Sequence, residues 1–140
     1  MNALALAATI LLLFPMLYFL IASLAFFLRS LEHSSATFLL RGLFSVCFLA
    51  VAVIGAIGAA AFAGAERPGV AIGFGLVAAL AAGVRAWFLQ QIDSAVTARD
   101  AGTGGALRRL RHLHIGGIAY NAMQLVAVVS SIPALFPAGA

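Results

Sequence analysis

The chain has 140 residues, of which 64% are hydrophobic and only 9% are charged, and its mean hydropathy is +1.14. A soluble domain is usually about 45–50% apolar and about 25% charged. So little charge leaves too little polar surface to cover a water-soluble globule of this size. The composition therefore excludes a soluble, disordered or collagen-like protein and predicts an integral membrane protein.

Four long apolar segments follow one another along the chain. A helix that spans a membrane needs roughly 20 consecutive apolar residues, and continuous apolar runs favour helices over the strands of a barrel. The first run is far longer than the 7–15 apolar residues typical of a secretory signal, so we expect a retained spanning helix there. We predict a single all-α transmembrane domain over residues 1–140, a four-helix bundle with helices at about 3–28, 42–64, 70–91 and 113–136.

Arginine is distributed unevenly between the connections. The chain has eight basic residues, all of them arginine, and four acids. Seven of the arginines lie in or beside the loops 29–41 and 92–112, and one, Arg67, lies in the turn between the second and third helices. Cytoplasmic loops of membrane proteins carry an excess of basic residues. We therefore expect both loops in the cytoplasm and both termini on the non-cytoplasmic side, which explains the pI of about 10.7 without nucleic acid.

Small residues recur on the second and third helices at spacings that favour close packing. Apolar attraction between helices is weak in lipid, so close contact depends on small side chains. We expect the two helices to pack through Ala52, Ala56, Ala60, Gly69, Gly73, Gly75, Ala79 and Gly83. A chain rich in alanine and glycine also produces such spacings by chance, and a dimer face is a third interpretation of one stripe.

Polar side chains inside a membrane are costly and are therefore candidates for function. At about 100° per residue, the fourth helix presents His114, Asn121 and Gln124 as one polar stripe. Three charged residues start from the same membrane boundary, namely Arg85, Glu32 and Asp93. We expect a buried cluster that joins the stripe to Arg85 and one of the two acids. It is either a solute, ion or cofactor site or a set of bonds that fixes helix register.

A basic cluster precedes the fourth helix. Arg108, Arg109 and Arg111 are expected to contact anionic lipid headgroups, because each basic residue near the surface contributes on the order of 1 kcal/mol. Plain topological anchoring explains the same residues. The amphipathic stretch 107–112 is expected to lie along the headgroups before the chain turns into the membrane.

No metal site, cofactor or catalytic arrangement is expected. His112 and His114 lie two residues apart and so point to nearly opposite faces of a helix, and no cysteine or acid stands at ligand spacing. The sequence has no nucleophile paired with histidine and an acid, no HExxH motif and no phosphate-binding loop. An enzyme is therefore not expected. A haem- or metal-binding redox subunit that uses His33, His112 and His114 remains a third class of hypothesis.

Several motifs point to a known family. Arg41-Gly42-Leu43-Phe44 opens the second helix, and Ile92-Asp93, Arg99-Asp100 and Leu110-Arg111-His112-Leu113-His114 lead into Asn121 and Gln124. In these motifs the chain resembles bacterial four-helix membrane proteins of unknown function related to transmembrane protein 205. That pattern has a serine where this chain has Gly117, and often a proline where it has Ser45. The resemblance implies the four-helix fold and a multi-pass location in the bacterial inner (cytoplasmic) membrane.

Two functions are expected from these features. The first is a small non-catalytic membrane protein that acts through helix packing, as a homo-oligomer or as an auxiliary subunit of a larger membrane complex. The alternative is a small transporter or channel for an ion, metal or small solute, with its polar site on the fourth helix. The expected partners are the lipid bilayer, including anionic lipids, and other membrane subunits or a second copy, but no nucleic acid.

Overall fold

The computed structural model describes residues 3–135, whose regular secondary structure is entirely helical. The four helices are α1 (Ala3–Ala25), α2 (Ser34–Gly64), α3 (Pro68–Asp100) and α4 (Ala106–Leu135). Each is long and apolar enough to span a membrane. The chain is thus an all-α, multi-pass membrane protein by helix length and hydropathy, as the composition predicted.

Three helices extend beyond the apolar segments that marked them in the sequence, by residues 34–41, 92–100 and 106–112. Hydropathy records where the hydrocarbon core ends, whereas the backbone hydrogen bonds of a helix continue through polar residues. The connections are therefore 26–33 and 101–105, which are shorter than the predicted loops. The predicted end of the fourth helix, at position 136, lies outside the described residues.

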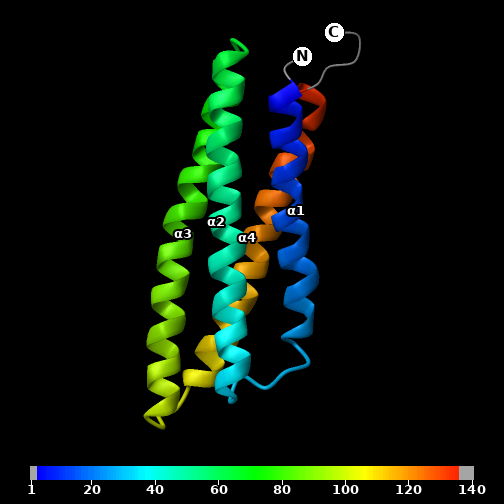
Figure 1. Ribbon diagram of the computed structural model, residues 1–140. Helices are drawn as coiled ribbons and strands as arrows, with labels where there is room; N and C mark the ends of the chain where they lie inside the picture. Colours follow the sequence, from blue (N-terminus) through cyan, green and yellow to red (C-terminus); the bar gives the residue numbers. More distant parts are fainter. Residues whose placement is uncertain (1–2, 136–140) are drawn as a thin grey trace.

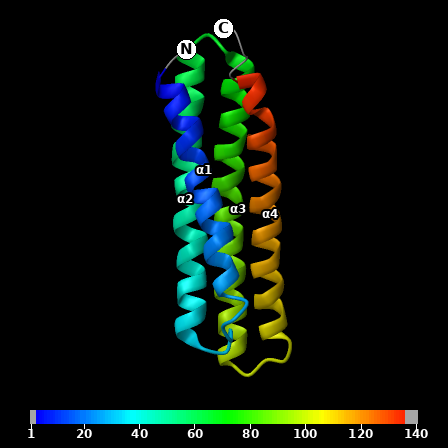
Figure 2. The ribbon, with the colours of Figure 1, turned by 90° about the vertical axis from the view of Figure 1, so that its right-hand side faces the viewer.

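The four helices run antiparallel along one direction (Figure 2). They form a ring in which α1 packs on α2, α2 on α3, α3 on α4, and α4 on α1. The connections 26–33 and 101–105 lie at one end of the ring, and the turn at 65–67 lies at the other (Figure 1). Six of the eight arginines lie at the first end, which we call the basic end: Arg29, Arg41, Arg99, Arg108, Arg109 and Arg111.

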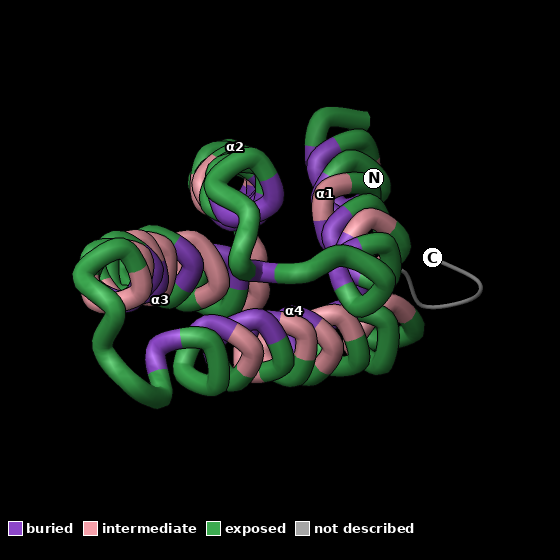
Figure 3. Tube along the Cα trace, turned by 90° about the horizontal axis from the view of Figure 1, so that it is seen from below, coloured by how far each residue is buried: buried purple, intermediate pink, exposed green. Residues whose placement is uncertain are grey.

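The buried residues of all four helices face the centre of the ring (Figure 3). In the half nearer the basic end, this core is aromatic. The ring of Phe44 lies 5.1 Å from that of Phe19 and 4.9 Å from that of Phe88, measured between centroids. The ring of Phe48 stacks on Phe19 at 5.2 Å. Helices α1, α2 and α3 are therefore joined through one aromatic cluster.

The predicted contact between α2 and α3 forms, and the two helices approach most closely at Gly55 and Gly58. A Cβ atom built on Gly58 would lie 2.3 Å from Cδ1 of Phe74, and one built on Gly55 would lie 3.1 Å from Cβ of Ala78. Only two of the predicted residues, Ala52 and Gly75, are partly buried, and the others are exposed: Ala56, Ala60, Gly69, Gly73, Ala79 and Gly83. A repeat of four residues advances about 400° and so drifts off the contact face.

Candidate functional site

Three side chains of α4 donate hydrogen bonds to backbone carbonyls of α1 and of the connection that follows it. The donors are Arg111, His114 and Asn121. Their bonds pair Arg111 with Phe26 and Arg29, His114 with Ser23, and Asn121 with Met16, at donor–acceptor distances of 2.9–3.2 Å. We call these three side chains and four carbonyls the α1–α4 ladder.

The ladder has a constant antiparallel register. Seven residues separate His114 from Asn121, and seven separate their acceptors, Ser23 and Met16. The step of three from Arg111 to His114 is matched by an equal step on the chain of α1. Since both helices rise by the same distance per residue, the bonds lie along one line. The ladder therefore fixes both the height and the rotation of α1 against α4.

His114 is fully buried, with an exposed fraction of 0%, and both of its ring nitrogens are in use. The carbonyl of Ser23, 3.0 Å from Nε2, can only accept, so Nε2 carries the proton. The Nη1 of Arg111, 3.0 Å from Nδ1, can only donate, so Nδ1 accepts. The ring is thus the neutral Nε2-protonated tautomer, and neither nitrogen has a lone pair left for a metal ion.

Three buried oxygen atoms on the polar stripe or facing it from α1 have no hydrogen-bond partner among residues 3–135: Ser23 Oγ, Asn121 Oδ1 and Gln124 Oε1. The amide nitrogen of Gln124 donates to the hydroxyl of Tyr120 at 3.1 Å. A buried polar atom that lacks a partner costs free energy unless water or a ligand supplies the hydrogen bond. These oxygens can still accept hydrogen bonds from a water molecule or a ligand.

The charged residues expected beside the stripe do not join it. Arg85 donates instead to Ser45, through Nε to the carbonyl at 2.9 Å and through Nη2 to the hydroxyl at 2.7 Å. Asp93 pairs with Arg41, with 2.6 Å between Oδ1 and Nε, and Glu32 is exposed. The reason is the rotation of the two neighbouring helices, because Arg85 and Asp93 on α3 face α2, whereas His114 and Asn121 on α4 face α1.

The three arginines expected at the lipid surface have different environments. Arg108 is exposed. Arg109 donates to Gln91 on α3, and to Ser94 at 3.4 Å. Arg111 is partly buried in the ladder instead of facing lipid. Its position three residues before His114 places both on one helix face, and this spacing was the signal that would have assigned it to the stripe.

The histidines do not gather into a metal site. Among the described residues, no three histidine, cysteine or acidic side chains lie close enough together to hold a metal ion. His33 and His112 are exposed, whereas His114 is buried in the ladder.

Comparison with family models, with curated proteins and with solved structures finds no match to this chain. Its function must therefore be inferred from its physical properties. It is a four-helix protein with four candidate membrane spans, in which side chains of the last helix bond to backbone oxygens of the first.

Proposed function

We propose that the protein is a non-catalytic integral membrane protein that acts through helix packing, as a homo-oligomer or as an auxiliary subunit of a larger membrane complex. The α1–α4 ladder carries this proposal. Its three donors bond to the backbone of a neighbouring helix, which is how polar side chains hold membrane helices together. In a transporter, the same groups would line a wet path across the membrane.

Open glycines on α3 support a packing role toward other chains. Two of them, Gly69 and Gly73, line an apolar groove of about 390 Å³ between α3 and residues of α4 and α1. A Cβ atom built on Gly69, Gly73 or Gly83 would meet nothing within 4 Å, so these glycines leave open space on the helix surface. Glycine within a helix costs about 1 kcal/mol relative to alanine. Small residues on a lipid-facing helix allow a second helix to approach its backbone closely. We therefore assign the contact with a partner subunit to this face of α3.

Substitution of one open glycine tests the proposal. Gly73→Leu would fill the groove that Gly73 lines beside α3, whereas Ala82→Leu adds the same bulk at an exposed position on the other side of the helix. In lipid nanodiscs, chemical crosslinking should yield an oligomer or a complex with a co-purifying subunit that Gly73→Leu weakens and Ala82→Leu preserves. A wild-type chain that is monomeric and partner-free at native levels contradicts the proposal.

The location and orientation belong to the same proposal. The collection of six arginines at the basic end supports placing that end in the cytoplasm of a bacterium, with both termini on the other side of the inner membrane. Membership of the family related to transmembrane protein 205 is likewise proposed from the motifs that lead into Asn121 and Gln124. Reporter fusions to the connection 101–105 and to the C-terminus test the orientation.

A small transporter or channel for an ion, metal or small solute is the second candidate. One observation favours it, namely the three buried oxygens without partners on Ser23, Asn121 and Gln124. In a background with Cys47→Ala, we would introduce Gln124→Cys and measure its reaction with a water-soluble methanethiosulfonate reagent. Fast labelling of Gln124→Cys would support a water-filled path. Labelling as slow as that of the buried Cys47 in the wild-type chain would support the packing role.

A further inference from the structure

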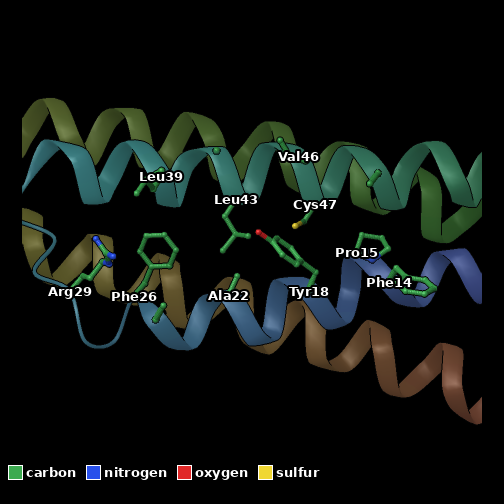
Figure 4. A pocket seen from close by; sticks show the side chains of 13 residues that line it. Phe14, Pro15, Tyr18, Ala22, Phe26, Arg29, Leu39, Leu43, Val46 and Cys47 are labelled. Carbon is green, nitrogen blue, oxygen red and sulfur yellow. The ribbon is translucent and has the colours of Figure 1, made fainter.

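A groove runs along the outside of the bundle between α1 and α2 (Figure 4). It encloses about 720 Å³ and is lined mainly by apolar side chains, among them Phe14, Leu43 and Val46. The lining on α1 extends from Phe14 to Ala25, which is about 16 Å at 1.5 Å per residue. One leaflet contributes about 15 Å of a hydrocarbon core that is roughly 30 Å thick. The groove therefore matches one leaflet in length and in chemistry.

The groove opens toward lipid. Phe14, Tyr18 and Val46 have exposed fractions of 65%, 63% and 67%, so they form walls that no other part of the described chain covers. Cys47 is buried at the α2 side of the groove. The side chain of Tyr18 points across it toward α2 (Figure 4). A long apolar chain that enters from the bilayer would meet apolar surface on both sides.

A positive charge stands at the end of the groove nearer the basic end. Arg29 lines this end, and its guanidinium turns toward the space between α1 and α2 (Figure 4). Its backbone carbonyl accepts a hydrogen bond of 3.2 Å from Arg111, which fixes the position of the connection and brings a second guanidinium close. The ion pairs found among residues 3–135 involve other arginines: Arg41 with Asp93, and Arg99 with Asp100.

We propose that this groove binds one anionic phospholipid, with an acyl chain between α1 and α2 and the phosphate on Arg29. A guanidinium donates strong, charge-assisted hydrogen bonds to phosphate oxygens, and the apolar walls gain free energy when they are covered by a hydrocarbon chain. A zwitterionic lipid would bring its own cation next to Arg29 and so bind less well. The site lies on α1 and α2 and is independent of the proposed packing face on α3.

Native mass spectrometry of the full chain in detergent micelles tests this site. The probes are phosphatidylglycerol and phosphatidylcholine with identical acyl chains. One phosphatidylglycerol should bind roughly five-fold more tightly than phosphatidylcholine, the ratio that corresponds to about 1 kcal/mol for a basic residue at the surface. Arg29→Gln should abolish this preference. Arg108→Gln, which removes an exposed arginine at the same end but outside the groove, should preserve it.

A second pair of variants tests the acyl-chain part of the site. Ala22 lines the groove and Ala7 is an exposed residue of α1 outside it. Ala22→Phe should lower the affinity for both lipids several-fold, while Ala7→Phe should leave both unchanged. Equal binding of the two lipids by the wild-type chain would overturn the proposal. So would a preference that survives Arg29→Gln, or binding unaffected by Ala22→Phe.

Discussion

Gly117 of α4 leaves the space that the ring of Phe44 of α2 occupies at the centre of the bundle. A Cβ atom at Gly117 would lie 2.3 Å from Cζ of Phe44 and 3.4 Å from Cζ of Phe19. These rings belong to the aromatic cluster that joins α1, α2 and α3. Because Gly117 has no side chain, Phe44 of α2 and Phe19 of α1 can both pack against α4 at this point.

Gly117→Ala should destabilise the protein by about 1–3 kcal/mol, the usual cost of overpacking a filled core. The neighbouring Gly116 provides a matched control, because a Cβ built there would lie 3.9 Å from Phe88, an ordinary contact. Gly116→Ala should be neutral or slightly stabilising, since alanine favours the helix. Thermal unfolding in detergent measures both variants. Equal melting temperatures for the two would contradict the role assigned to Gly117.

His114→Ala should lower the free energy of unfolding by about 1–3 kcal/mol. The substitution removes two hydrogen bonds of the ring, one to the carbonyl of Ser23 and one from the guanidinium of Arg111. The Ser23 carbonyl keeps its bond from the backbone N–H of Phe26, so the larger part of the loss is the bond to the charged guanidinium, a type worth about 1.5–3 kcal/mol. His112→Ala, at an exposed position two residues earlier, should have little effect. Chemical or thermal unfolding of both variants in the same detergent measures the difference, and a His112→Ala variant as unstable as His114→Ala would refute the assignment.

Ser45→Ala should have a smaller effect, about 0.6 kcal/mol, which is the average measured for hydrogen bonds between membrane helices. The variant removes the hydroxyl that accepts from Nη2 of Arg85 at 2.7 Å, but it retains the carbonyl that accepts from Nε. Ser130→Ala, at an exposed position of α4, is the control and should not change the melting temperature. A loss above 2 kcal/mol would mean that Arg85 depends on the hydroxyl alone.

Arg67→Gln should loosen the last turn of α4. The guanidinium of Arg67 donates to the carbonyl of Ala134 at 2.9 Å and also to that of Leu135, and the final carbonyls of a helix have no partner of their own. Amide hydrogen exchange in this turn should become about five-fold faster, which corresponds to roughly 1 kcal/mol for a lost hydrogen bond. Unchanged exchange, or an equal increase throughout α4, would argue against a local capping role.

The number of helices long and apolar enough to span a membrane could be predicted from the sequence because apolar length alone determines it. Their ends could not. Residues 34–41 and 92–100 are polar enough to read as loops, but they are helical in the structure. An ion pair between helices, Arg41 with Asp93, lies within these extra turns. Such a pair is visible only once the two helices have been placed side by side.

The polar stripe on α4 could be predicted from its helical spacing, but its partners could not. The donors His114 and Asn121 bond to backbone carbonyls of Ser23 and Met16, and every residue has a carbonyl, so no side-chain pattern marks the acceptors. The expected charged partners, such as Asp93, lie on α3 and face α2 instead of the stripe. The rotation of α3 and α4 about their own axes decided the outcome, and a single sequence does not record how a helix is rotated against its neighbours.

The α1–α4 ladder has a consequence for how the protein is made. Helix α1 is synthesised before α4, and four backbone carbonyls between Met16 and Arg29 accept hydrogen bonds from side chains of α4. Until α4 has entered the bilayer, α1 can pack on α2 through apolar and aromatic contacts, but it lacks the hydrogen bonds that fix its height and rotation against α4. Final assembly is thus a late event, and a chain truncated before residue 106 should insert α1 without holding it in one position.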